Sequence, residues 1–157
     1  SLEWLLASNM IYKCNLLNSI NIPPEAFKNE DVFKIYMGDI GILNTMLKIN
    51  TNEIYLDKPF IYKGDIAENY VANQLIFNNV ALYYWATASN SEIDFIIYNE
   101  DGIIPIEVKA SDNTQSKSLN AYVKKYNPKY SIRVSGKNFG FENRIKSVPL
   151  YAAYLIK

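Results

Sequence analysis

The sequence contains no histidine and a single cysteine, Cys14. Without histidine, this chain cannot build a catalytic triad, a general base or a metal site that depends on an imidazole. One cysteine excludes an internal disulfide, and it excludes a zinc site built from several cysteines. Any catalysis must therefore use carboxylates, lysine, tyrosine, serine, or a metal ion held by oxygen ligands.

Long apolar runs are missing as well. No run approaches the ~20 apolar residues that a membrane-spanning helix needs, and no signal peptide is visible. We therefore expect a cytoplasmic protein with no membrane partner. The first residues, SLEWLLASNM, have the pattern of a helix end, and we interpret the chain as a fragment of a longer protein.

Each half of the sequence is short of charges of one sign. Residues 1–102 contain 6 Lys or Arg and 13 Asp or Glu, whereas residues 103–157 contain 10 and 3, so the overall net charge is zero. A basic half can provide a phosphate-binding surface. The alternative is a set of scattered, solvated lysines.

The order of apolar and polar residues predicts a mixed α/β fold. From Asp65 onward the pattern predicts helix, strand, strand, strand, helix, strand and helix, which is typical of an α/β sandwich with a mixed sheet. Asp39 is expected to cap a helix, and Gly64 to act as a hinge. Helices are expected at 2–6, 40–47, 65–77 and 150–156, and one more helix is expected to start within 114–118 and to end at Pro128. Strands are expected at 11–17, 32–37, 81–85 and 130–134, with a hairpin at 92–110. Loops are expected at 51–60 and 136–140.

The most informative stretch runs from Glu92 to Ala110. Two β-rich apolar runs flank Asp101-Gly102, a dipeptide that favours a tight hairpin turn. A two-residue loop at this dipeptide places Asp94 opposite Lys109, and a four-residue loop places it opposite Glu107. Because side chains alternate along a strand, either register puts these three charged residues on one face of the hairpin.

Two acids and a lysine on an apolar hairpin require an explanation, because buried charge is costly unless it is paired or bound to a metal. One explanation is a structural ion pair of Lys109 with Asp94 or Glu107. The other is a catalytic site. In either case the opposite face is expected to enter the core through Phe95, Ile97, Ile106 and Val108.

Glu68 has two interpretations of its own, a carboxylate of the catalytic site and a helix cap. In the predicted helix it lies on or beside the inward face formed by Val71, Ala72 and Leu75. Asp65 and Glu68 also fit a capping box, in which Glu68 bonds back to the start of the helix. Spacing alone favours the capping role.

The charged residues can provide a magnesium site. Mg²⁺ prefers carboxylate oxygens and water, usually with only one or two protein carboxylates. Asp94 and Glu107 can supply them, together with the backbone carbonyl of Val108 and, if its helix packs across the sheet, Glu68. Lys109 would orient or deprotonate an attacking water and offset developing charge on a phosphate. This set of groups suits phosphodiester hydrolysis.

The same residues carry a resemblance to known families. Glu68, Asp94 and the triplet Glu107-Val108-Lys109, on a helix, a strand and a hairpin, resemble the PD-(D/E)xK nuclease superfamily, although Ile93 replaces the proline before the aspartate. Further blocks span nearly the whole chain: FKIYMGDIGIL (33–43), KGDIAENYVANQL (63–75), YYW (83–85), EIDFII (92–97), PIEVKAS (105–111), SKSL (116–119) and VPLYAAYL (148–155). With these blocks the chain resembles a prokaryotic family in which a C-terminal domain of unknown function follows an AAA-type ATPase module and a winged helix.

The resemblance implies a restriction-endonuclease-like core at 61–157, with a central mixed sheet flanked by helices, and a winged-helix tail with a connecting segment at 1–60. The implied cofactor is Mg²⁺ or Mn²⁺. ATP would belong to the missing N-terminal module, because this chain has no phosphate-binding glycine-lysine loop. The implied site comprises the metal ligands Asp94 and Glu107, the catalytic lysine Lys109 and the helix carboxylate Glu68.

Two functions follow as hypotheses. The first is a metal-dependent nuclease that acts on DNA and is coupled to the ATPase module of its parent chain. The second is an inactive DNA-binding or protein-interaction module that regulates the ATPase, which the 13 tyrosines would suit. The protein could form an oligomer under either hypothesis. A glycosidase with a pair of carboxylates is disfavoured, because this sequence has no second motif for sugar binding. The basic residues expected at phosphates are Lys117, Lys124, Lys125 and Arg133.

Overall fold

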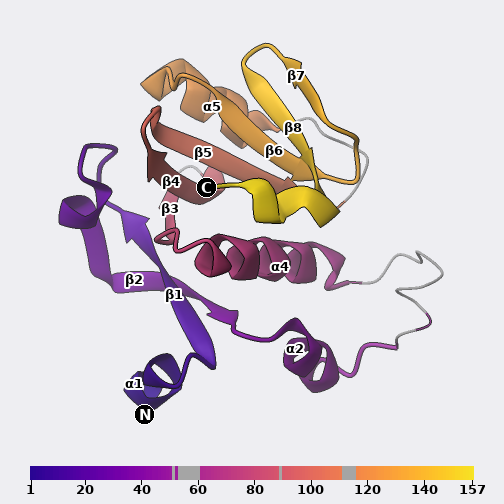
Figure 1. The fold of residues 1–157 in the computed structure, drawn as a ribbon. Helices are drawn as coiled ribbons and strands as arrows, with labels where there is room; N and C mark the ends of the chain where they lie inside the picture. Colours follow the sequence, from indigo (N-terminus) through magenta and orange to yellow (C-terminus); the bar gives the residue numbers. More distant parts are fainter. Residues whose placement is uncertain (51, 53–60, 89, 111–115) are drawn as a thin grey trace.

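The computed structural model describes residues 1–50, 52, 61–88, 90–110 and 116–157. Its strands are β1 (Ile11–Leu17), β2 (Lys28–Met37), β3 (Tyr83–Ala86), β4 (Glu92–Asn99), β5 (Gly102–Lys109), β6 (Ser131–Ser135), β7 (Gly140–Glu142) and β8 (Ile145–Pro149). They form one mixed sheet in the order β2-β1-β3-β4-β5-β6-β8-β7 (Figure 1). The pairs β1–β3, β5–β6 and β6–β8 are parallel, and the others are antiparallel.

Helices cover both faces of this sheet (Figure 1). α4 (Lys63–Phe77) packs with the 3₁₀ helix η2 (Leu150–Leu155) on one face, and α5 (Lys117–Tyr126) packs against β4 on the other. Further helices are α1 (Leu2–Ala7), α2 (Ile40–Met46) and the 3₁₀ helix η1 (Pro24–Phe27). This arrangement confirms the predicted α/β fold with a mixed sheet flanked by helices. No helix in the described part of the chain is long and apolar enough to cross a membrane.

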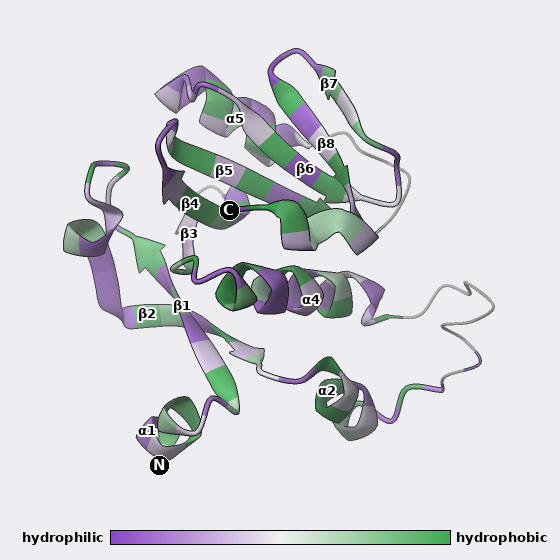
Figure 2. Ribbon diagram, in the orientation of Figure 1, coloured by the Kyte–Doolittle hydropathy of each residue, from purple (hydrophilic) through white to green (hydrophobic). Residues whose placement is uncertain are grey.

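Each face of the sheet has its own hydrophobic core. Under α4, Val71, Ala72 and Leu75 are fully buried, as predicted, in a cluster with residues of β4, β5 and β6. Under α5, Leu119 and Tyr122 are fully buried with residues of β3 and β4. Figure 2 shows apolar residues along β4 and β5, and the central residues of both strands are buried, as is expected of strands that are covered on both faces.

Local signals placed several element ends correctly. β1 has the predicted bounds. Asp39 caps α2, because its side chain accepts a hydrogen bond from the N–H of Ile42 at 2.9 Å. α5 starts after Ser116, whose hydroxyl oxygen accepts a hydrogen bond from the N–H of Leu119 at 3.0 Å, and it ends before Pro128.

Other boundaries were wrong. β2 begins at Lys28, four residues before the predicted start, because it stays paired with β1 as far as Leu17. α4 begins at Lys63, so Gly64 lies in its first turn and is not a hinge. The loop predicted at 51–60 lies outside the described residues except for Asn52.

The β7–β8 hairpin was not predicted. Its turn, Asn143-Arg144, has φ angles of 50° and 60°, in the left-handed region that two-residue hairpin turns require. Arginine gives no signal for such a turn, so the sequence indicated only a loop at 136–140 in this region. The helix predicted at 150–156 forms as the 3₁₀ helix η2.

β1 and β2 join the main sheet through β3, where Asn15 and Leu16 form parallel pairs. α4 also holds the end of β2. The side chain of Asn69 accepts a hydrogen bond from the N–H of Met37 at 2.8 Å and donates one to its carbonyl at 2.9 Å. The sheet therefore crosses the predicted division between the N-terminal 60 residues and the rest. That division stays a prediction.

Candidate functional site

β4 and β5 form the predicted hairpin. Their antiparallel pairing runs from Phe95 and Ile106 to the turn at Glu100-Asp101. This register places Asp94 opposite Glu107, as the predicted four-residue loop would. The turn itself has two residues, Glu100 and Asp101, and matches neither predicted loop. The four apolar residues that were predicted to enter the core from this hairpin all pack in the cluster under α4.

A β-bulge distorts β4 at Asp94. Ile93 and Ile96 pair with β3 residues that are only two apart, so two residues of β4 lie opposite one residue of β3. Ile93 and Ile96 consequently pack in the same cluster, which strict alternation does not allow. The argument that alternation alone fixes the face of Asp94 was therefore wrong. Bulges of this kind often re-aim a side chain beside a functional site.

The carboxylate of Asp94 is anchored to β5. Its Oδ2 accepts a hydrogen bond from the N–H of Val108 at 2.7 Å. Burial, followed by repulsion from Glu68, raises the pKa of Asp94 from 3.8 to about 7. Glu107 acts in the same direction, whereas the Val108 N–H and Lys34 partly offset the increase. The nearby positive charge is thus too weak to stabilise the ionised carboxylate of Asp94 fully.

Glu107 and Lys109 form an ion pair along β5. Their charged atoms lie 2.7 Å apart, and the side chains are 5% and 31% exposed, respectively. The pair proposed as the structural alternative is therefore present. However, it uses only Oε1 of Glu107. Oε2 is buried and has no hydrogen-bond partner among the described residues, and such an atom calls for a ligand or a water.

Glu68 does not form the predicted capping box. α4 begins at Lys63, so Glu68 lies in the second turn of the helix rather than at its third residue. Its Oε1 accepts a hydrogen bond from the hydroxyl of Tyr36 and lies 3.0 Å from the ammonium of Lys34. The helix carboxylate is therefore directed at β2, and it influences the pKa of Asp94 from there.

The sequence argument missed the contribution of β2. Lys34 forms ion pairs with both Glu68 and Glu92, and Tyr36 lies two residues further along the same strand. Alternation within the predicted strand 32–37 could have placed Lys34 and Tyr36 on one face. It could not have named their partner, because Glu68 is 34 residues away from Lys34 in the sequence.

The predicted divalent cation would have few protein ligands here. In the described residues, no group of three or more His, Cys, Asp or Glu is arranged to hold a metal. Asp94 and Glu107 still provide two carboxylates, which is the number that Mg²⁺ usually takes from a protein. A cation beside Glu107 would satisfy its Oε2, which has no partner among the described residues. A positive charge near Asp94 would favour the ionised form of that carboxyl. Glu68 and the Val108 carbonyl stay predicted ligands.

The predicted phosphate-binding residues are divided between two elements. Lys117, Lys124 and Lys125 lie on α5, and the ammonium of Lys125 lies 5.0 Å from the ring centre of Tyr126. Arg133 lies next to Glu107 in the β5–β6 register, and its buried Nε has no hydrogen-bond partner in the part of the chain that the structure describes. The lysines therefore lie on the exposed side of α5, and the arginine lies beside Glu107.

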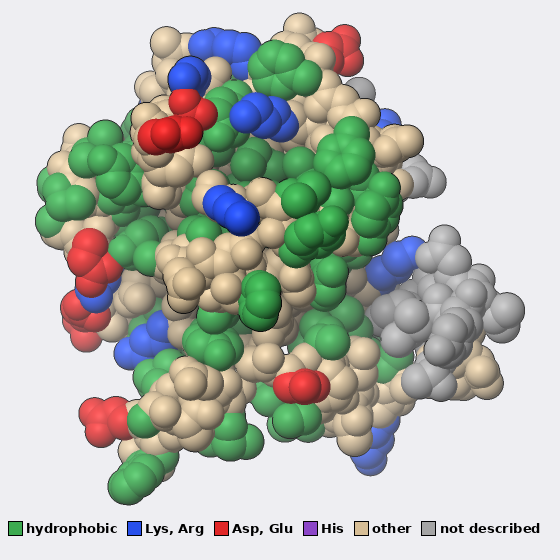
Figure 3. Space-filling view, viewed as in Figure 1, with side chains coloured by type: hydrophobic (Ala, Val, Ile, Leu, Met, Phe, Trp, Pro, Cys, Tyr) green, Lys and Arg blue, Asp and Glu red, His purple; other side chains and the backbone are tan. Residues whose placement is uncertain are grey.

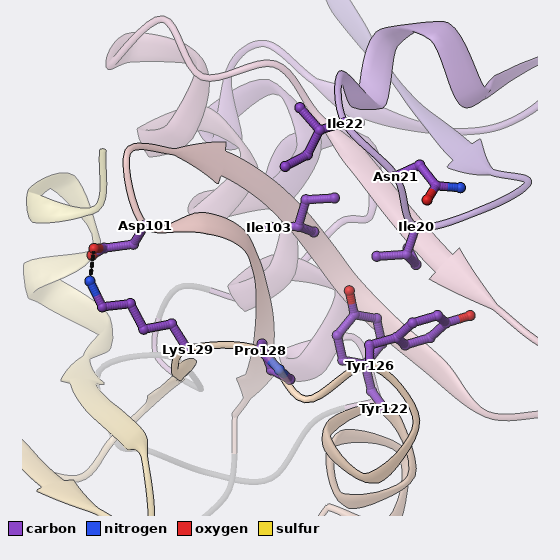
Figure 4. Close-up of a pocket in the computed structure, with 9 residues that line it drawn as sticks. All are labelled: Ile20, Asn21, Ile22, Asp101, Ile103, Tyr122, Tyr126, Pro128 and Lys129. Carbon is purple, nitrogen blue, oxygen red and sulfur yellow. Dashed lines mark hydrogen bonds and ion pairs between the residues drawn. The ribbon is translucent and has the colours of Figure 1, made fainter.

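A separate concavity of about 370 Å³ lies between the β4–β5 turn and α5 (Figure 4). Its charged residues, Asp101 and Lys129, form an ion pair with each other. None of the acids and lysines of the predicted site lines it, so it offers space but no acid–base chemistry linked to the site. The lining consists of Ile20, Asn21, Ile22, Asp101, Ile103, Tyr122, Tyr126, Pro128 and Lys129.

One face of the molecule carries exposed apolar side chains over β7, β8 and η2 (Figure 3). Phe139, Phe141 and Tyr151 are 55%, 65% and 70% exposed. A groove beside them is lined by Phe139, Gly140, Phe141, Lys146, Ser147 and Val148. Exposed aromatic side chains in one area are typical of surfaces that bind another molecule.

The comparison with protein families matches residues 63–153, more than half of the chain, to Domain of unknown function (DUF4143). The chain belongs to this family. The comparisons with curated proteins and with solved structures gave no match. The part matched to DUF4143 contains all the predicted site residues, including Glu68 and Lys109, and it begins after Lys34 and Tyr36.

Proposed function

We propose that this DUF4143 domain is a metal-dependent nuclease that hydrolyses phosphodiester bonds in DNA. The observation that carries the proposal is the buried Oε2 of Glu107, which has no partner among the residues that the structure describes. Glu107 lies opposite Asp94 in the register of a hairpin that also bears Lys109. A structural ion pair alone gives no reason for an unsatisfied carboxylate oxygen in the core.

Asp94 and Glu107 would hold Mg²⁺ or Mn²⁺, with Glu68 and the Val108 carbonyl as further ligands. When bound, the ion would polarise the phosphate and lower the pKa of an attacking water. Lys109 is 31% exposed at the end of β5, so it can reach a phosphate oxygen or a water while Glu107 fixes its position. Its positive charge would offset the charge that develops in the transition state.

The wider context forms part of the same proposal. We infer a restriction-endonuclease-like core for the domain, a winged-helix tail in the N-terminal segment, and an AAA-type ATPase module in the parent chain. The match to DUF4143 and the mixed sheet flanked by helices are compatible with this context. Lysines on α5 would contact DNA phosphates, which predicts binding that weakens as salt rises.

An inactive module that binds DNA or another protein is the second candidate. The exposed aromatic side chains over β7, β8 and η2 favour it, because a nuclease site on β4 and β5 does not account for them. In this case the ion pair of Lys109 with Glu107 would be structural, and the protein would bind neither Mg²⁺ nor Mn²⁺.

The test combines calorimetric titration of Mn²⁺ with a plasmid-nicking assay on the same samples. We expect wild type to bind Mn²⁺ and nick, Asp94→Ala to lose both activities, and Lys109→Ala to bind Mn²⁺ without nicking. Asp101→Ala is the matched control, because this aspartate lies in the turn of the same hairpin and outside the site. If wild type and Asp94→Ala are both folded and neither binds Mn²⁺, the nuclease is excluded and the binding module is favoured.

A further inference from the structure

Lys34 brings positive charge to three carboxylates. Its ammonium lies 3.0 Å from Oε1 of Glu68, forms a second ion pair with Glu92, and partly offsets the raised pKa of Asp94. Its side chain is 24% exposed, so solvent screens these contacts only in part. By contrast, Lys109 pairs with Glu107.

Lys34 stays protonated, and its strand is fixed in position. Burial lowers the pKa of Lys34, but Glu68 and Glu92 outweigh that effect and raise it, so the ammonium stays charged at neutral and mildly alkaline pH. The end of its strand is fixed to α4 through the hydrogen bonds of Asn69 with Met37. The backbone of β2 is therefore fixed beside α4, and the two ion pairs hold the ammonium of Lys34 next to Glu68 and Glu92.

We propose that Lys34 is a built-in counter-cation of this site: it neutralises Glu68 and Glu92 when no divalent ion is bound, and it weakens the binding of such an ion by repulsion. The inference rests on the metal-binding half of the proposed function. A positive charge so close to the acids raises the electrostatic cost of adding a second cation. Removing it is expected to strengthen Mn²⁺ binding by about tenfold.

The experiment compares Mn²⁺ affinity in wild type, Lys34→Gln and Lys28→Gln by calorimetry at about pH 8, where protons compete little with Asp94. Glutamine removes the charge but keeps a donor for Glu68. Lys28 is the matched control, because it lies on the same strand and pairs with two glutamates, Glu25 and Glu30, outside the site. Thermal unfolding of each variant establishes that it is folded, and Lys34→Met is a second charge-removing variant in case glutamine is not tolerated.

We expect a lower Kd for Lys34→Gln and an unchanged Kd for Lys28→Gln. Binding by Lys34→Gln that is equal to or weaker than that of wild type would overturn the counter-cation and leave the metal site intact. Absence of binding in every folded variant would overturn the metal site and, with it, this inference. Binding by Lys34→Gln but not by wild type would support the inference in its strongest form.

Discussion

Replacing Asp94 with asparagine should stabilise the metal-free protein, and the gain should grow with pH. The pKa of Asp94 rises from 3.8 to about 7, and each pKa unit corresponds to about 1.4 kcal/mol. Ionising this carboxyl therefore costs the folded protein about 4 kcal/mol relative to the unfolded chain. Asparagine keeps an oxygen that can accept the hydrogen bond of Val108 and carries no charge near Glu68 and Glu107.

The direction in which stability changes with pH follows from the direction of the pKa shift of Asp94. A carboxyl whose pKa is higher in the folded state binds its proton more tightly there, so the wild type loses stability as pH rises from about 4 through 7. Asparagine at this position does not titrate. Between about pH 5 and about pH 8.5, the advantage of Asp94→Asn over wild type should thus grow by about 3 kcal/mol.

Urea unfolding at the two pH values, in the presence of a chelator and followed by tryptophan fluorescence, measures the difference. Asp101→Asn is the control, because hydrogen bonding to Lys129 lowers the pKa of Asp101. The stabilisation from ionised Asp101 is complete above about pH 5, so this variant should differ from wild type by the same amount at both pH values. A stability difference between Asp94→Asn and wild type that is the same at both pH values would refute the reasoning. It would mean that the raised pKa of Asp94 is absent in solution.

Three further predictions concern the same elements. Tyr36→Phe should lower the free energy of unfolding by about 2 kcal/mol, because Glu68 loses a hydroxyl donor; an unchanged urea midpoint would contradict that bond. Ser116→Ala should cost about 1 kcal/mol through loss of the cap on the N–H of Leu119, and the exposed Ser8→Ala should cost less in the same assay. Saturating Mn²⁺ should raise the Tm of wild type at about pH 8 and leave that of Asp94→Asn unchanged; equal shifts would place the ion elsewhere.

The sequence was sufficient where the signal was local. Asp101-Gly102 predicted the hairpin, and Ser116 and Asp39 marked helix starts, because turns and caps depend on residues a few positions apart. The start of α4 was misplaced for a related reason. Asp65 suits an N-cap and also suits the first turn, where its charge interacts favourably with the helix dipole, so its presence does not distinguish the two.

The rest of the site depends on contacts that no local pattern encodes. The bulge at Asp94 inserts one residue into β4, and alternation counted along the sequence cannot detect an extra residue. The contacts of Lys34 and Tyr36 with Glu68 require that β2 pack beside α4, across 34 and 32 residues of sequence. The charged residues of the hairpin could be predicted, but the residues that balance Glu68 could not.

The place of β1 between β2 and β3 affects where the chain can be shortened. A protein that began at Lys63, where the family match begins, would keep Glu68 and lose Lys34 and Tyr36. It would also leave β3 as an uncovered edge strand rich in aromatic residues, and such edges promote aggregation. Poor solubility of that shortened protein would therefore reflect the cut and not the fold of the family, and work on the site should keep the strands that precede the match.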